Sequence, residues 1–176
     1  MQSNSFIDNL YDEGLIDNKV FSLYLSHESN FRNTSMITIG GYDVDRFAWN
    51  QTVTWNDVTN TAYWTVDLKK AQIGDTMVVK STNNAILDSG TSFIAMPDKE
   101  LKSLVSLLGS VYNFDCEYYD EDELYACACP DINAYKETFP PLKVTLGESN
   151  TYEIPYDEYS ERVNGLCYLT IMSLGE

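Results

Sequence analysis

Hydrophobic and polar residues alternate with a period of two along much of the chain, and follow a helical period in two segments. In the first, the apolar residues of Phe6–Tyr11 follow Ser5, a good N-cap, and precede Gly14. In the second, apolar residues repeat at helical spacing over Leu101–Leu108, and Gly109 stands just beyond. The pattern therefore predicts two helices, ending near Gly14 and Gly109.

The strand-like runs are short and closely spaced, which is typical of antiparallel sheets. An acidic, tyrosine-rich stretch at Asp115–Asp122 is expected to be a surface loop or hairpin. We expect a mainly β fold with few short helices, and 176 residues fit one domain. The expected strands are Phe21–Leu25, Met36–Gly41, Thr52–Trp55, Ala62–Leu68, Thr76–Val79, Ala85–Leu87 and Leu142–Leu146.

The charge and hydropathy of the sequence limit the classes of partner that the chain is expected to bind. The net charge of -16 repels phosphate backbones and anionic lipid, so neither nucleic acid nor a membrane surface is an expected partner. No apolar run approaches the roughly 18 to 20 residues of a membrane span. The N-terminal residues lack the basic and continuous apolar regions of a signal peptide.

The chain has four cysteines and two glycosylation acceptor patterns, which suggest an oxidising compartment. Four cysteines allow three disulfide connectivities, and a pair at i and i+2 is poorly placed to bond. A zinc site is the alternative, but no Cys-x-x-Cys pair is present. The cysteines are Cys116, Cys127, Cys129 and Cys167, and the acceptor asparagines are Asn33 and Asn50.

Several catalytic classes are excluded by the motifs that the sequence lacks. His27 is the single histidine, so a His-Glu-x-x-His zinc motif cannot exist. No Gly-x-Ser-x-Gly elbow and no glycine-rich phosphate loop occurs. Carboxylate chemistry is what remains.

Asp88 is the candidate for that chemistry, because Asp-Ser-Gly-Thr stands between two apolar runs within Asn84–Met96. We expect buried strand residues on both sides, where an unpaired carboxylate would be costly. The hydroxyl groups and backbone N–H groups of the following turn can donate to it. An ordinary Asx turn is the alternative for these four residues alone.

The sequence here resembles the C-terminal lobe of the pepsin-like aspartic proteases. The similarity extends from about residue 5 to the end, and the landmarks occur in the family's order and spacing. They are Phe6–Ile16, Val20–Leu25, Ile39–Asp43, Val53–Trp55, Tyr63–Trp64 and Ala85–Ser92.

The resemblance implies that Asp88 is one of two aspartates that activate water to hydrolyse a peptide bond. It also implies disulfides between Cys129 and Cys167 and, as an extra bridge, between Cys116 and Cys127; no cofactor or metal is implied. Supporting roles fall on Ser89, Gly90 and Thr91, substrate-backbone contacts on Thr91 and Ser92, and primed-side pockets on Ile86 and Tyr63, with plain core packing as the alternative for the last two.

The family pattern is incomplete in this sequence. No second Asp-Ser/Thr-Gly occurs, and the chain stops before the strand that closes the family's active-site loop. We therefore expect residues 1–176 to be a partial peptidase domain, truncated at both ends, and inactive alone.

Three hypotheses follow from this incompleteness. The chain is part of a two-lobed endopeptidase, or half of a homodimeric protease, or a non-catalytic peptide-binding lobe. The first is preferred, with a peptide or protein substrate and the missing N-terminal lobe or a second copy as partners. The family and the cysteines place it in a lysosome or vacuole, or outside the cell.

Overall fold

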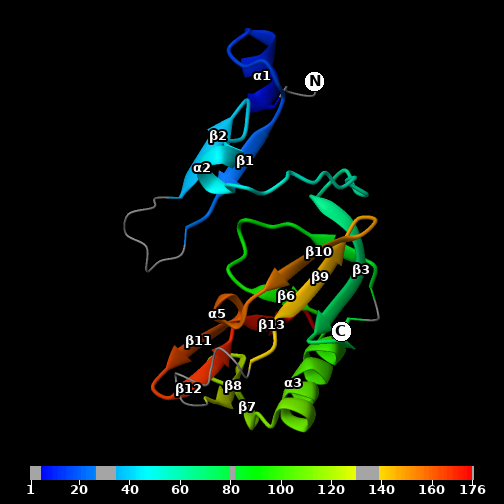
Figure 1. Ribbon diagram of the computed structural model, residues 1–176, viewed down its shortest axis with the longest axis vertical. Helices are drawn as coiled ribbons and strands as arrows, with labels where there is room; N and C mark the ends of the chain where they lie inside the picture. Colours follow the sequence, from blue (N-terminus) through cyan, green and yellow to red (C-terminus); the bar gives the residue numbers. More distant parts are fainter. Residues whose placement is uncertain (1–4, 27–34, 80–81, 130–138, 176) are drawn as a thin grey trace. The chain divides into compact units, whose positions relative to one another are not determined.

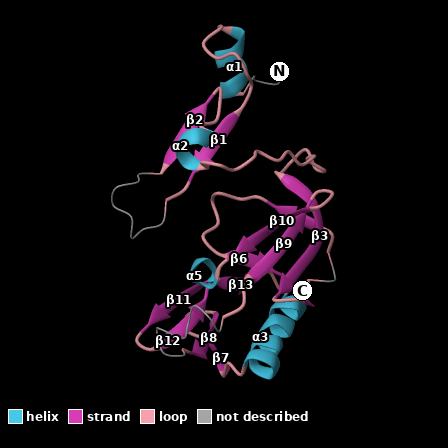
Figure 2. Cartoon of the chain, viewed as in Figure 1, coloured by secondary structure: helices cyan, strands magenta, loops and turns pink. Residues whose placement is uncertain are grey.

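The computed structural model describes residues 5–26, 35–79, 82–129 and 139–175 (Figure 1). The chain divides into two compact units, Met1–Thr54 and Trp55–Glu176, and each is described by itself. Strands supply most of the regular structure (Figure 2). Within the described ranges, no helix has both the length and the apolar character that a membrane crossing requires.

The first unit begins with helix α1 (Phe6–Asp12), as predicted. The Ser5 hydroxyl accepts the backbone N–H of Asp8 at 3.2 Å, and the Asp8 carboxylate accepts the backbone N–H of Ser5 at 3.2 Å. This reciprocal capping box satisfies N–H groups that a helix start leaves without partners. Gly14 follows with φ +69°, in the left-handed region that favours glycine.

A two-stranded antiparallel hairpin completes the regular structure of this unit, together with one short helix. Strands β1 (Phe21–Tyr24) and β2 (Met36–Ile39) pair in register, Phe21 opposite Ile39, which confirms both predicted strands. Helix α2 (Val44–Phe47) begins at Asp43, whose carboxylate accepts the N–H of Arg46. None of the described residues of this unit is fully buried, so its core is small.

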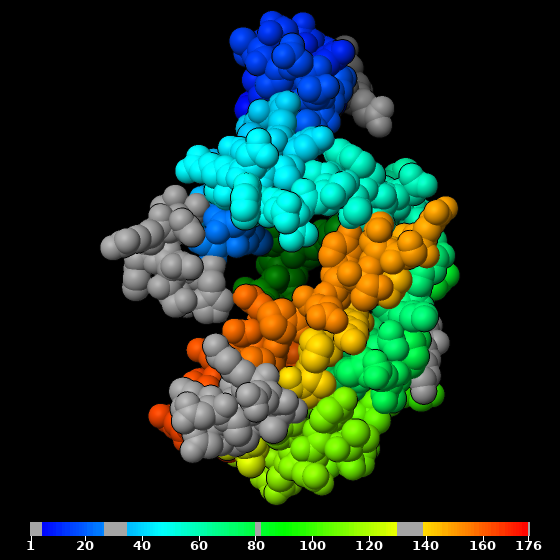
Figure 3. All heavy atoms as spheres, in the orientation of Figure 1, coloured from blue at the N-terminus to red at the C-terminus, as the bar shows by residue number. Residues whose placement is uncertain are grey.

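The described residues of the second unit form three sheets, and its regular elements confirm the predicted mainly β fold. The largest has the strand order β10–β9–β3–β4, with β5 also paired to β3; β9 and β10 lie side by side, yellow to orange in Figure 3. A second sheet has the order β11–β12–β8–β7, and β6 pairs with β13 in parallel. The elements are β3 (Thr65–Ile73), β4 (Thr76–Met77), β5 (Asn84–Ile86), β6 (Ile94–Met96), α3 (Asp98–Tyr112), β7 (Cys116–Tyr119), β8 (Leu124–Ala128), β9 (Leu142–Leu146), β10 (Asn150–Ile154), α5 (Tyr156–Tyr159), β11 (Ser160–Val163), β12 (Leu166–Leu169) and β13 (Ile171–Ser173).

Helix α3 supplies one side of the core of this unit. Leu104 and Leu108 are fully buried, and they join Ile73 of β3 and Leu169 of β12 in one apolar cluster. The predicted end near Gly109 is wrong, because the helix continues to Tyr112. Asn113 ends it instead: its φ of 58° is left-handed, a conformation that asparagine tolerates better than most residues.

Three strand predictions need correction. The strand expected at Thr76–Val79 ends at Met77. Thr52–Trp55 forms no strand, and within the described ranges the nearest pairing is an isolated bridge between Val58 and Val66. An alternating pattern makes a strand only where a partner strand supplies hydrogen bonds. The strand expected at Ala62–Leu68 begins at Thr65 and continues to Ile73, because β9 pairs with its polar second half.

Candidate active site

Asp88 lies in the turn between β5 and β6, in the second unit. Strand β5 pairs with β3, with Thr65 opposite Ile86, and β6 pairs with β13. The backbone N–H of Leu87 donates to the carbonyl of Trp64 at 2.9 Å. This bond attaches Leu87, the residue just before Asp88, to the residue that precedes β3. The position of Asp88 is therefore set by two strands far apart in sequence.

Both carboxylate oxygens of Asp88 accept hydrogen bonds from its own turn. The Thr91 hydroxyl donates to Oδ2 at 2.6 Å, and the backbone N–H of Gly90 donates to Oδ1 at 2.9 Å. The Thr91 hydroxyl and, second, the Gly90 N–H lower the pKa of Asp88 below its ordinary value, since both bonds favour the ionised form. The turn thus holds an oriented carboxylate that is ionised in mildly acidic water.

The expectation that Asp88 sits in the core is wrong. Asp88 and its turn neighbours through Phe93 are exposed, and the flanking Ile86 and Leu87 are 55% and 54% exposed. Among the described strands, the three-residue β5 pairs only with β3, so little chain covers it. The carboxylate is therefore open to water on the surface of the described chain.

The other predicted site residues lie around the same turn. Ser89 and Ser92 are exposed beside Asp88. Ile86 and Tyr63, the latter 64% exposed, are not packed in the core, so plain core packing does not account for them. The structure brings Ile86 and residues 88–92 together at the end of β5; Tyr63 precedes β3, two positions before the Thr65 that pairs with Ile86.

Sequence reasoning missed the apolar surroundings of this turn. It assigned Leu87 and Phe93 to buried strand, yet both side chains are exposed on the two sides of Asp88. It also gave no role to Trp64, whose side chain is 58% exposed and whose carbonyl accepts the Leu87 N–H. The hydrophobic pattern indicated that these side chains are buried. It could not show that no other part of the described chain packs over them.

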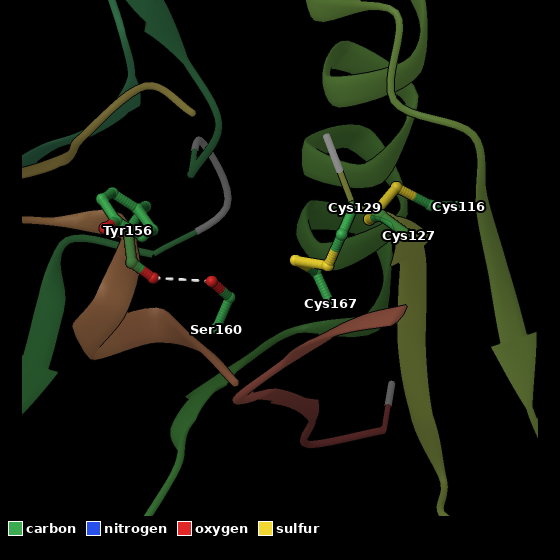
Figure 4. The surroundings of a disulfide bond; sticks show 6 residues. All are labelled: Cys116, Cys127, Cys129, Tyr156, Ser160 and Cys167. Atoms are coloured by element: carbon green, nitrogen blue, oxygen red, sulfur yellow. Dashed lines mark hydrogen bonds between the residues drawn. A yellow bond between two sulfur atoms is a disulfide. The ribbon is translucent and has the colours of Figure 1, made fainter. Parts of the chain in front are cut away.

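The cysteines form two disulfides, Cys116–Cys127 and Cys129–Cys167, and Figure 4 shows them side by side. This is the pairing that the family resemblance implies. All four sulfurs are bonded in pairs, so the zinc alternative is wrong for these cysteines. Nearby, the Ser160 hydroxyl donates to the carbonyl of Tyr156 at 2.7 Å and ties β11 to the start of α5.

Three remaining sequence features are placed as follows. Asn50 is exposed and has a φ of 63°, at the first position of its acceptor pattern. Asn33 and His27 lie outside the described residues. The described ranges contain no group of three or more histidine, cysteine or acidic residues that could hold a metal ion.

The family model for eukaryotic aspartyl protease matches residues 1–176. Rhizopuspepsin-5 of Rhizopus niveus is 33% identical over 170 residues, which are 97% of this chain and 39% of that protein. The probable vacuolar protease A of Arthroderma benhamiae is 29% identical over 94% of this chain and 38% of its own length. Cathepsin E of Mus musculus is 35% identical over 64% of this chain and 30% of its own length.

Solved structures share the fold. The aspartic proteinase from Irpex lacteus superposes with a TM-score of 0.71 at 16% identity, over 97% of this chain and 50% of that one. Basic 7S globulin from soybean gives a TM-score of 0.74 at 12% identity, over 97% and 45%. The chain spans about 39% of the length of rhizopuspepsin-5, which was matched by sequence.

Proposed function

Because this chain belongs to the eukaryotic aspartyl protease family, we propose that it supplies Asp88 to the two-aspartate active site of an aspartic-type endopeptidase. The observation that carries the proposal is the exposed Asp88 carboxylate, held on both oxygens by Thr91 and Gly90. A chain that spans 39% of rhizopuspepsin-5 holds one such motif, so the complete reaction needs a second aspartate from elsewhere.

The chemistry follows from placing two carboxylates close together. They cannot both ionise easily, so they share one proton, as is general for aspartic protease dyads. The ionised member takes a proton from water as the water attacks the peptide carbonyl, and the protonated member donates to the substrate. The bonds from Thr91 and Gly90 lower the pKa of Asp88, which favours its ionised form and hence the role of base.

The surrounding residues have supporting roles in this proposal. Thr91 and the N–H of Gly90 orient Asp88, and Ser89 bonds across to the opposite lobe. Thr91 and Ser92 meet the substrate backbone. Ile86 and Tyr63 line primed-side pockets, and their large exposed areas make such contacts possible.

An N-terminal lobe is the proposed partner, with a second copy of this chain as the alternative. The exposed apolar side chains on either side of Asp88, Leu87 and Phe93, favour a covering protein surface over permanent contact with water. Residues 1–176 are then a partial peptidase domain that is inactive alone.

The two disulfides favour a secretory, lysosomal or vacuolar route. The relatives named vacuolar protease A and cathepsin E are consistent with that route. We place this protein in a lysosome-like or vacuolar compartment or outside the cell, where an acidic pH suits a dyad that carries one proton. Asn33 and Asn50 are the proposed glycosylation sites there.

The test is cleavage of an apolar peptide at acidic pH over a series of protein concentrations, with Asp88→Asn as the matched control. We expect no cleavage above that control from this chain alone, and Asp88-dependent cleavage once an N-terminal lobe of a pepsin-like protease is supplied. A rate that rises with the square of concentration without the added lobe would support the homodimer instead.

Binding of a peptide-like aspartic protease inhibitor separates the remaining possibility. If the inhibitor binds the assembled lobes while cleavage stays at the Asp88→Asn level, the chain is a non-catalytic binding lobe and the endopeptidase proposal fails.

A further inference from the structure

Three of the four cysteines form a row across three neighbouring strands. Cys116 of β7 lies directly opposite Cys127 of β8, and Cys127 lies directly opposite Cys167 of β12. Residues directly opposite each other in antiparallel strands have their side chains on the same face. Cys127 therefore lies between two cysteines on one face of the sheet and is bonded to one of them, Cys116.

The alternative bond between Cys127 and Cys167 fits the existing strand register. Opposite residues of an antiparallel pair have Cα atoms about 4.5 or 5.5 Å apart. Bridged cysteines usually have Cα atoms about 4.4 to 6.8 Å apart. A Cys127–Cys167 bridge thus needs side-chain rotation rather than a shift of β8 past β12.

Burial separates the sulfurs into an inner and an outer pair. Cys127 and Cys167 are 0% exposed, whereas Cys116 and Cys129 are partly exposed. Each disulfide therefore joins one inner cysteine to one outer cysteine (Figure 4). A thiolate from solution reaches the outer sulfurs first, since exchange rates depend on access to the sulfur attacked.

We propose that this row of cysteines is a thiol-exchange site. Reaction with a small external monothiol replaces the two existing disulfides with one disulfide between Cys127 and Cys167. The external thiolate attacks the Cys116 sulfur, forming a mixed disulfide there and releasing Cys127 as a thiolate. Cys127 then attacks the Cys167 sulfur, which forms the inner bridge and releases Cys129 as a thiolate that takes up a proton.

Electrons balance over the complete sequence. A second external thiolate attacks the external sulfur of the mixed disulfide at Cys116, which frees the Cys116 thiol. Two external thiols are oxidised to one external disulfide, and the two protein disulfides become one disulfide and two thiols. Attack at Cys129 gives the same product, because the released Cys167 thiolate attacks Cys127 and frees Cys116.

Burial favours the internal exchange step. A thiolate released at Cys127 or Cys167 is costly because these sulfurs are buried; its attack on the other inner sulfur replaces it with a thiolate at a partly exposed cysteine. The outer cysteines keep contact with water as thiols. The exchange also changes the covalent links: the β7–β8 hairpin loses its bridge, and the bond to β12 moves from Cys129, just after β8, to Cys127 within β8.

The test is partial reduction of the folded, fully oxidised chain with reduced glutathione, followed by acid quenching and labelling with N-ethylmaleimide. Peptide mapping by mass spectrometry identifies the labelled cysteines, and fragmentation distinguishes Cys127 from Cys129. We expect the first two-electron product to carry labels on Cys116 and Cys129 and to contain a Cys127–Cys167 cross-link. Labels on Cys116 with Cys127, or on Cys129 with Cys167, would mean independent reduction and overturn the proposal.

A pair of double variants provides a matched check. In Cys116→Ser/Cys129→Ser we expect the inner cysteines, Cys127 and Cys167, to form a disulfide. In the control Cys116→Ser/Cys127→Ser we expect Cys129 and Cys167 to form one. The far-ultraviolet circular dichroism spectrum of both variants should match that of the unaltered chain. Two free thiols in a folded Cys116→Ser/Cys129→Ser chain would count against the exchange. If that variant does not fold, the labelling of the unaltered chain decides.

Discussion

At the scale of single residues, two carboxylates in this chain are held in the same way. The Asp88 carboxylate accepts hydrogen bonds from Thr91 and Gly90, and the Asp8 carboxylate accepts them from Lys19 and from the hydroxyl and backbone N–H of Ser5. In both cases hydrogen-bond donors favour the charged form and the side chains stay exposed to water; the donors to Asp88 lie within its own turn, whereas Lys19 reaches Asp8 from eleven residues away. The chain thus orients an acid by hydrogen bonding at a place where its reactivity is not limited by burial.

For Asp88, we expect Thr91→Val to raise the pKa, because it removes the larger of the two bonds that lower it. A lowered pKa in the folded state adds stability above the unfolded pKa, and this is lost as pH falls through the folded value. In the variant that loss should move to higher pH. Carboxyl titration by NMR measures the shift. Ser92→Ala is the control, and an equal shift there would contradict the role of Thr91.

For Asp8, Lys19 is the first cause and Ser5 the second, and together they lower the pKa to about 2 from 3.8. We expect Lys19→Met to raise this pKa more than Ser5→Ala does. The contribution of Asp8 to the stability of α1 is present above pH 3.8 and declines as pH approaches about 2. NMR titration of both variants checks the order, and a larger effect of Ser5→Ala would contradict it.

At the scale of elements, sequence patterns predicted those whose determinants are local. The N-cap at Ser5 was sufficient to predict the start of α1, and the alternating period was sufficient to predict β1, because capping and alternation depend on neighbouring residues. Patterns failed where pairing with a strand distant in sequence determines the extent of an element. Strand β3 extends through Lys69 and Lys70 because β9 pairs with that region. They failed at Thr52–Trp55 for the opposite reason, since an isolated bridge is the only pairing near it in the described ranges.

The candidate site shows the same division. The motif sequence predicted that the turn's own hydroxyl and N–H groups donate to Asp88, and the Thr91 hydroxyl and the Gly90 N–H do so, because both lie within three residues of it. It did not predict exposure, because apolar neighbours such as Leu87 fit a core and a covered interface equally well. Spacing also left the disulfide pairing open, since pairing depends on which strands are adjacent.

Helix α3 offers a direct test of which elements carry the stability. Leu104→Ala should lower the free energy of unfolding by about 2–5 kcal/mol, because it leaves a cavity at a fully buried position. Val111→Ala on the same helix removes a 57% exposed side chain and should cost about 0.5 kcal/mol or less. Urea unfolding of both variants measures the difference. Equal losses would show that α3 is not packed against the core as described.

At the scale of the whole molecule, a large negative charge coexists with many exposed apolar side chains. The formal net charge is -16 at pH 7, and large apolar residues such as Leu87, Trp64 and Phe93 stay accessible. Charge repulsion keeps such surfaces apart in solution, whereas loss of charge lets them meet. Whether the chain is solitary or associated therefore depends on pH.

This balance predicts acid-induced association of the isolated chain. The sequence pI is about 4.2, so repulsion is weakest near that pH, which is also where protease assays would be made. We expect a monomer at pH 7 and larger species near pH 4.2 by sedimentation velocity, with added salt moving the onset to higher pH by screening the repulsion. Association that is independent of both pH and salt would contradict this control by charge. Asp88→Asn removes only one carboxylate, so this variant should associate in the same way. If the cleavage rate of the unaltered chain depends on concentration and that of Asp88→Asn does not, the dependence comes from the active site and not from surface association.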